Sequence, residues 1–168
     1  MLAILQEHGR QHLAEIAKEV GLSAPAVMER VKKLESRGVI KGFHAILDAK
    51  KLGRNITAFI GVSVNHQRYI DNVGSLMATR KDVLECHHVT GEASFVVKVK
   101  TADTDALEKL IAEIRSMEGV TRTVTSVVLS TAKETSILSL ETVLEESLKE
   151  EARHVEQSRR FTGTLGKK

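Results

Sequence analysis

The sequence predicts an α+β fold in which a helical first part precedes a domain of alternating strands and helices. Apolar residues recur at helical spacing up to Arg37, whereas from Ile56 they alternate at every second position. Alternation of this kind indicates a strand with one buried face. The polar, turn-like stretch of residues 48–55 separates the two patterns. We therefore expect a first domain at 1–47, a hinge at 48–55 and a second domain at 56–140.

Composition restricts the class of protein. The chain has 168 residues, of which 42% are hydrophobic and 28% charged, as in an ordinary globular protein. It has no apolar run of the roughly 20 residues needed to span a membrane and no secretory signal. Its single cysteine, Cys86, excludes an internal disulfide framework and fits a cytoplasmic location. Aromatic residues, at 3%, are too few to stack single-stranded bases, which favours duplex DNA among nucleic acids.

Residues 12–37 form a predicted helix-turn-helix. The first helix has one apolar stripe (Leu13, Ile16, Ala17 and Val20), and Gly21 ends it. Ser23 is a favourable N-cap for the second helix, and Pro25 fits its first turn. The inward face of this second helix consists of Val27, Val31 and Leu34.

The outward face of the second helix suits a DNA major groove. Its first turn has small residues that permit a close approach to base edges, and basic residues follow at helical spacing. The predicted DNA-binding residues are Ser23, Ala24, Ala26, Arg30, Lys33 and Arg37. Residues 1–53 also contain nine Lys and Arg against six Asp and Glu, which equals the net charge of +3 of the whole chain. The alternative is an ordinary amphipathic hairpin with a solvated charged face.

Two flanking segments complete the first domain. Residues 1–8 are expected to be the end of a helix that packs across the pair, and Gly9 ends it. Residues 39–47 are rich in β-forming residues and are predicted to be a wing strand.

The second domain has the order β-α-β-β-α-β of a ferredoxin-like fold. We expect strands at 56–64, 83–90, 94–100 and 120–129, with helices around 69–77 and 104–117. Both helices then cover one face of the sheet. Phe59 and the threonines Thr121, Thr123 and Thr125 are expected on the other face, which a second copy would cover in a homodimer.

The C-terminal region departs from this plan. Residues 137–140 are expected to form a short strand, and Thr142 with Glu145 is a capping-box pair that begins an extra helix to about Arg160. This helix, within an extension at 141–168, is either a solvated appendage or a surface for a partner helix.

The sequence resembles the Lrp/AsnC family of transcriptional regulators, also called feast/famine regulators. The resemblance rests on EIAKEVGLSAPAVMERVKKLESRGVIKGFHAILD, on ECHHVTGEASFVVKV and on GVTRTVTSVVLSTAKET. It implies a winged helix-turn-helix joined to a sensing domain, dimers that form octamers or related assemblies, and DNA as the partner in the nucleoid. Family members usually have further residues before Met1, which implies a truncated first helix here.

The resemblance also implies a small effector, commonly an amino acid, bound between dimers, and no cofactor. Carried over by position, the effector residues are Gly91, Glu92, Ala93, Ser94, Thr123, Thr125, Val127 and Val128. Glu92 can accept hydrogen bonds from an α-ammonium group. Many relatives have a second acidic residue and an aromatic where Ala93 and Ser94 stand here. The Gly91–Glu92 pair is alternatively a simple hairpin turn.

Three other kinds of function, a metal site, an enzyme and an architectural protein, are considered from the residues that each would need. Cys86 and His88 share a strand face, but two ligands without a third make a weak metal site, so no metal is expected. No catalytic constellation indicates an enzyme. The alternative function is an architectural protein that coats DNA without an effector. A third possibility is a sensing dimer whose short first helix no longer supports DNA binding.

Overall fold

The computed structural model describes residues 1–140, and the predicted helix from Thr142 lies outside them. The described chain divides into two compact units, one made of residues 46–134 and the other of residues 1–45 together with residues 135–140. None of the described helices has both the length and the apolarity that crossing a membrane requires.

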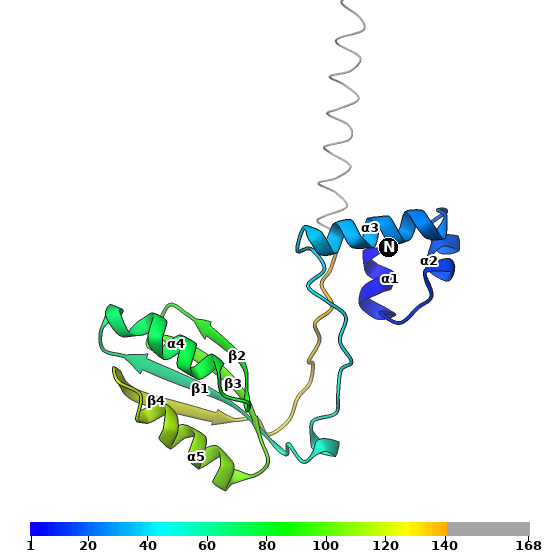
Figure 1. The fold of residues 1–168 in the computed structure, drawn as a ribbon. Coiled ribbons are helices and arrows are strands. Elements are labelled where there is room, and N and C mark those ends of the chain that lie inside the picture. Colours follow the sequence, from blue (N-terminus) through cyan, green and yellow to red (C-terminus); the bar gives the residue numbers. More distant parts are fainter. Residues whose placement is uncertain (141–168) are drawn as a thin grey trace, which may run out of the picture. The chain divides into compact units, whose positions relative to one another are not determined.

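In its described residues the first unit contains three helices: α1 (Leu2–Glu7), α2 (Leu13–Glu19) and α3 (Ala24–Ser36) (Figure 1). Its core consists of Leu5, Ile16, Ala17 and Val27. Leu22, in the turn between α2 and α3, packs against this core, and its backbone N–H donates to Ala17 O at 2.9 Å. The predicted helix-turn-helix and the short first helix are confirmed.

The two predicted short strands of this unit are wrong. Residues 39–48 and 131–140 have extended or irregular backbone and form no strand. A β-forming composition makes a strand only where a second strand supplies the hydrogen-bond ladder. Leu138 bonds instead to a side chain of α1: Gln6 Nε2 donates to Leu138 O at 3.1 Å, and Leu138 N–H donates to Gln6 Oε1 at 2.8 Å.

A short 3₁₀ helix, η1 (Lys50–Leu52), lies in the stretch predicted to be a hinge. The Asp48 carboxylate accepts the backbone N–H groups of Lys50 and Lys51 at 3.0 and 3.3 Å and so closes the turn. Arg54 forms an ion pair with Asp82 at 2.5 Å within the second unit, to which the whole of residues 48–55 belongs. Its role as a hinge stays a prediction.

The second unit has the predicted order β1 (Ile56–Val64), α4 (Ile70–Ala78), β2 (Val83–His88), β3 (Phe95–Thr101), α5 (Thr104–Arg115) and β4 (Val120–Val127), with a 3₁₀ turn, η2 (Gln67–Tyr69), before α4. The sheet is antiparallel with strand order β2-β3-β1-β4. The ferredoxin-like prediction is confirmed.

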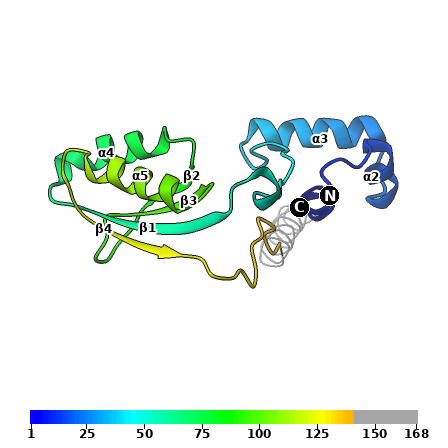
Figure 2. The same cartoon turned by 90° about the horizontal axis from the view of Figure 1, so that it is seen from below.

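Both long helices cover one face of this sheet (Figure 2). Ala58, Ile60 and Val62 of β1 and the alternate residues Phe95, Val97 and Val99 of β3 are buried against them. The helices contribute Ile70, Val73 and Met77 from α4 and Leu107, Leu110 and Ile114 from α5. We call the opposite side, which includes Phe59, Gly61 and Ser63 of β1, the uncovered face.

One predicted feature of the last strand is wrong. Thr123 pairs with Val62 and Thr125 with Ile60, so both threonines stand on the helix-covered side. The register shifts between Ser63 and Val64, where Arg122 and Val120 are their partners and Thr121 is the extra residue. An extra residue reverses the alternation of a strand. Arg122, Val124 and Ser126 therefore occupy the uncovered face instead of the threonines.

Candidate DNA-binding surface and effector region

The start of α3 is fixed by its cap. The Ser23 hydroxyl accepts the backbone N–H of Ala26 at 3.3 Å, and Pro25 follows within the first turn. Val27 is fully buried and anchors the helix on the core of the first unit. The small residues Ala24 and Ala26 are half-buried, and Ser23 is exposed. The first turn of α3 therefore has no bulky side chain at the predicted contact positions.

Three basic residues follow on the same helix. Arg30, Lys33 and Arg37 are all exposed. None of them forms an ion pair with another residue of the described part of the chain. Their charges are available to an anionic partner because no neighbouring carboxylate in residues 1–140 neutralises them. The structure thus brings all six predicted DNA-binding residues to α3 and its cap.

The predicted effector turn, residues 91–94, lies between β2 and β3 and is attached to the end of β1. Ser94 N–H donates to Val62 O at 2.9 Å, and the Ser94 hydroxyl accepts the N–H of Val64 at 3.1 Å. The Ser63 hydroxyl donates to Glu92 O at 3.2 Å. Gly91 has φ of 119°, a conformation that side chains rarely adopt. The Glu92 side chain is exposed on this fixed turn.

The other predicted effector residues belong to β4 and its end. Thr123 and Thr125 line an open cavity of about 720 Å³ against α5, together with Leu107, Ile111 and Arg115. Arg115 Nε donates to Thr123 Oγ1 at 2.7 Å. Val127 is exposed, and Val128 N–H donates to Thr57 O at 2.9 Å.

One chain does not bring the two groups of effector residues together. Ala93 lies over the uncovered face, since its Cβ is 3.5 Å from the position that a Cβ on Gly61 would occupy. Thr123 and Thr125 stand on the helix-covered side of the same sheet. A ligand that contacts both groups therefore needs a second copy of the chain.

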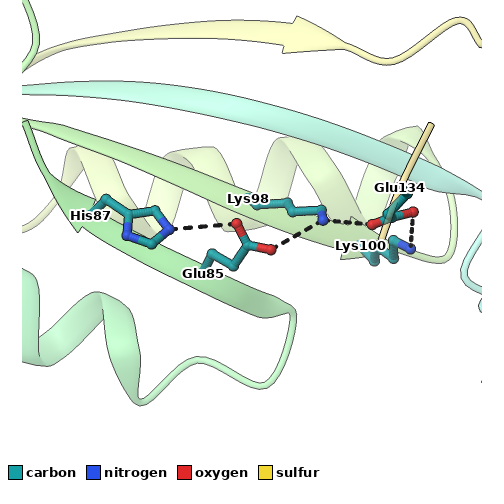
Figure 3. A network of polar contacts seen from close by, with 5 residues as sticks. All are labelled: Glu85, His87, Lys98, Lys100 and Glu134. Atoms are coloured by element: carbon teal, nitrogen blue, oxygen red, sulfur yellow. Dashed lines mark hydrogen bonds and ion pairs between the residues drawn. The ribbon is translucent and has the colours of Figure 1, made fainter. Parts of the chain in front are cut away.

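A charged cluster on the uncovered face was not predicted from the sequence (Figure 3). Lys98 Nζ lies 3.1 Å from Glu85 Oε1 and 2.5 Å from Glu134 Oε1, while Lys100 Nζ lies 3.6 Å from Glu134 Oε2. Hydrogen bonds from Lys98 lower the pKa of Glu134 and of Glu85, and the bond to Glu134 raises the pKa of Lys98. The sequence feature that could have indicated this cluster is the alternation of Lys98 and Lys100 with the buried residues Val97, Val99 and Thr101 of β3.

The histidine and cysteine side chains of β2 divide as predicted. Cys86 pairs with Val97 and His88 with Phe95 on the helix-covered side, whereas His87 lies on the other. The His88 and Phe95 rings are 5.2 Å apart, and burial raises the pKa of the Cys86 thiol. Across residues 1–140, no three His, Cys, Asp or Glu side chains are grouped as a metal site requires.

Two family models match the two units of the chain. Residues 1–41 match a winged helix-turn-helix DNA-binding model, and residues 57–138 match the Lrp/AsnC ligand binding domain. The transcriptional regulator FL11 of Pyrococcus horikoshii is 39% identical over 140 residues, which are 83% of this chain and 92% of that protein. The chain belongs to the Lrp/AsnC family. It is a helix-turn-helix transcriptional regulator with a ligand-binding domain, and its relatives are regulators rather than enzymes.

Solved structures of transcriptional regulators agree with this fold. A transcriptional regulator from Neisseria meningitidis in complex with L-methionine has a TM-score of 0.79 at 28% identity, covering 84% of this chain and 94% of that one. A feast or famine regulatory protein from Mycobacterium tuberculosis, also complexed with L-methionine, has a TM-score of 0.74 at 34% identity, covering 80% and 90%.

Proposed function

We propose that this Lrp/AsnC regulator binds specific sequences of double-stranded DNA through α3, and that an amino acid changes its assembly or its DNA binding. The exposed basic face of α3, unpaired within residues 1–140, is the observation that supports the DNA proposal. A helix of 13 residues is about 20 Å long and fits a major groove about 12 Å wide. Arg30, Lys33 and Arg37 would contact bases or phosphates.

The effector proposal rests on the turn at residues 91–94 and on β4. The exposed Glu92 carboxylate is suited to an α-ammonium group, and Gly91 allows a ligand to approach the backbone closely. Because Ala93 and Thr123 lie on opposite sides of the sheet, the proposed site combines the turn of one copy with β4 of another. A ligand between copies acts by binding one assembly better than another. The two L-methionine complexes of relatives support an amino acid as the class of effector.

Self-association is part of the same proposal. The uncovered face includes Phe59 and Val124, which are 41% and 50% exposed. A second copy that covers this face would form a dimer, and the effector site between copies implies association of dimers into an octamer or a related assembly. DNA binding is consistent with a cytoplasmic, nucleoid-associated protein.

The DNA proposal is tested by substituting two basic residues of α3. Arg30→Ala with Lys33→Ala removes two predicted contacts and should weaken binding to duplex selected by the wild-type protein about tenfold or more. The salt slope should also become shallower. The matched control, Lys81→Ala with Lys109→Ala, removes two exposed charges from the second unit and should bind normally. Equal weakening of both variants would contradict the proposed surface.

Footprinting with and without amino acids distinguishes a ligand-gated regulator from an architectural DNA-binding protein. Protection that changes with one amino acid, and no longer does so in Glu92→Gln, supports a ligand-gated regulator. Extended protection that no amino acid alters favours the architectural alternative.

A further inference from the structure

The chain that leaves β4 makes a second attachment to the sheet before it returns to the first unit. The first attachment is a backbone hydrogen bond to β1, in which Val128 N–H donates to Thr57 O at 2.9 Å. Glu134, six residues later, bonds to Lys98 and lies beside Lys100, both of β3. Since β1 lies between β4 and β3 in the sheet, the chain crosses β1 between residues 128 and 134 to make this contact. Figure 3 shows Glu134 beside the two lysines.

The contact is more restrained than a typical surface ion pair. The Lys98 side chain is 15% exposed and Lys100 is 20% exposed. Lys98 is held between two carboxylates, Glu85 and Glu134, while Glu134 faces two ammonium groups. Two positive and two negative charges balance within the cluster, so it adds no net charge to the uncovered face. Charge-assisted bonds of this kind are stronger than neutral ones.

A further attachment follows in the first unit. The side-chain amide of Gln6 both donates to and accepts from the backbone of Leu138. With Glu134 bound to Lys98, three residues (135–137) connect Glu134, which is attached to the sheet, with Leu138, which is attached to Gln6. With Glu134 released, nine residues (129–137) connect Val128 to Leu138. At about 3.5 Å per residue, the span from residue 134 to 138 is at most about 14 Å, against about 35 Å from residue 128.

We propose that Glu134 is a positioning residue that shortens the return connection and thereby limits the reach of the DNA-binding unit from the ligand-binding domain. The proposal rests on the proposed function, because reach matters when copies of α3 bind separate half-sites. After one DNA-binding unit has bound, a short connection gives the second unit a high effective concentration at a half-site of one spacing and a low effective concentration at half-sites of other spacings. Release of Glu134 lengthens the connection and broadens the spacings that can be bound.

The attachment itself is tested without DNA. Trypsin cleaves after Lys133, which is exposed and adjacent to Glu134, and Lys98→Gln removes the shorter of the two Glu134 ion pairs without altering the cleavage site. Mass spectrometry of the full chain should show the fragment ending at Lys133 forming several-fold faster, since cleavage tracks the population of the detached segment. Lys109→Gln is the charge-matched control, and Lys98→Arg should restore the slow rate. Light scattering and thermal unfolding identify variants that still assemble and fold.

An unchanged cleavage rate in a folded Lys98→Gln protein would overturn the proposal. Should Lys98→Gln not fold, Glu134→Gln, which changes an exposed residue, replaces it, with hydrogen exchange of residues 129–137 as the measurement. Faster exchange supports the attachment and unchanged exchange overturns it.

The consequence for reach is tested on DNA with two half-sites at varied spacing, taken from duplex selected by the wild-type protein. Glu134→Gln should flatten the dependence of affinity on spacing and leave binding to a single half-site unchanged. Glu108→Gln, an exposed residue of α5, should keep the wild-type profile. A wild-type profile in Glu134→Gln overturns the role in reach. If wild-type protein binds no duplex, the proposed function fails, whereas the trypsin result still decides the attachment.

Discussion

The two units of this regulator differ in how much core holds them together. The ligand-binding unit buries thirteen core residues between its sheet and two helices. The DNA-binding unit buries four among residues 1–45 and 135–140, the part of it that the structure describes. Each fully buried aliphatic side chain contributes about 1.5–3 kcal/mol, and domains of about 40 residues often need additional support. The comparison indicates that the DNA-binding unit is the less stable of the two and depends more on its caps and on contacts such as that of Gln6 with Leu138.

The largest effect is expected when a buried isoleucine is changed to alanine in the core of each unit. Ile60 and Ile16 are each fully buried, so Ile60→Ala and Ile16→Ala should each cost about 2–5 kcal/mol. Ile60→Ala should leave the ligand-binding unit folded with a lower midpoint, because that core is large. Ile16→Ala should unfold the DNA-binding unit and abolish binding to duplex, while the other unit melts unchanged. Calorimetry and amide hydrogen exchange measure the two units separately.

Loss of both units together in Ile16→Ala would contradict their separate stability. Ile16→Val provides a milder control and should retain binding, since it removes one methylene at a cost of about 0.5–1.5 kcal/mol.

A smaller effect is expected at the helix caps. Ser23 caps α3 and Asp103 caps α5 through Ala106 N–H at 2.8 Å, so each change to alanine should cost about 1 kcal/mol. The cost should lower the melting midpoint of the DNA-binding unit more, because its total stability is smaller. Ser23→Asp should restore that midpoint. If Ser23→Ala and Asp103→Ala lowered the midpoints of their units equally, the two units would not differ in stability as inferred. Thermal unfolding, rather than DNA binding, is the measurement because Ser23 is also a proposed contact.

The smallest effect concerns pH. All ion pairs within residues 1–140 lie in the ligand-binding unit. The lowered pKa of Glu134 means that its stabilisation is present above the ordinary value of 4.5 and is lost as pH falls below it. The raised pKa of Lys98 means that its share is present below 10.5 and is lost as pH rises above it.

The difference in unfolding free energy between wild type and Glu134→Gln should therefore be constant near neutral pH and disappear in acid. It should not exceed about 1 kcal/mol, because the Glu134 side chain is half-exposed. Unfolding followed from neutral pH to well below pH 4.5, through the lowered pKa of Glu134, measures it, with Glu108→Gln as the control. A difference that grows in acid would contradict the pairing.

The elements of the fold were predictable because local patterns determine them. The alternation of Ala58, Ile60 and Val62 and the capped stripe of α5 each specify one element with one buried face. The absence of the expected wing strand at residues 39–47 was not predictable, because composition does not reveal whether a second strand is available to pair. The side chains of β4 were also misplaced, since the bulge at Thr121 is fixed by pairing with Ser63 and Val64 on a distant strand.

The candidate sites were predictable to a similar degree. The positions of the six residues on α3 and its two caps follow from one helical period and one cap, so the sequence sufficed to place them. Their contact with DNA stays a prediction. The effector residues carried over from the family fall on two sides of one sheet, which a linear sequence cannot express. The cluster of Lys98 with Glu85 and Glu134 joins residues from two strands and a later segment, so its members stand apart along the chain.

The contact between Gln6 and Leu138 has a consequence for how such regulators exchange parts during evolution. The helix-turn-helix is not self-contained within residues 1–45, because Gln6 bonds to Leu138, which follows the sheet in the chain. A recombination event that replaced only the codons of residues 1–45 would separate Gln6 from its partner. Successful grafting of a new operator specificity onto this ligand-binding domain should therefore require the matching codons downstream of Glu134 as well.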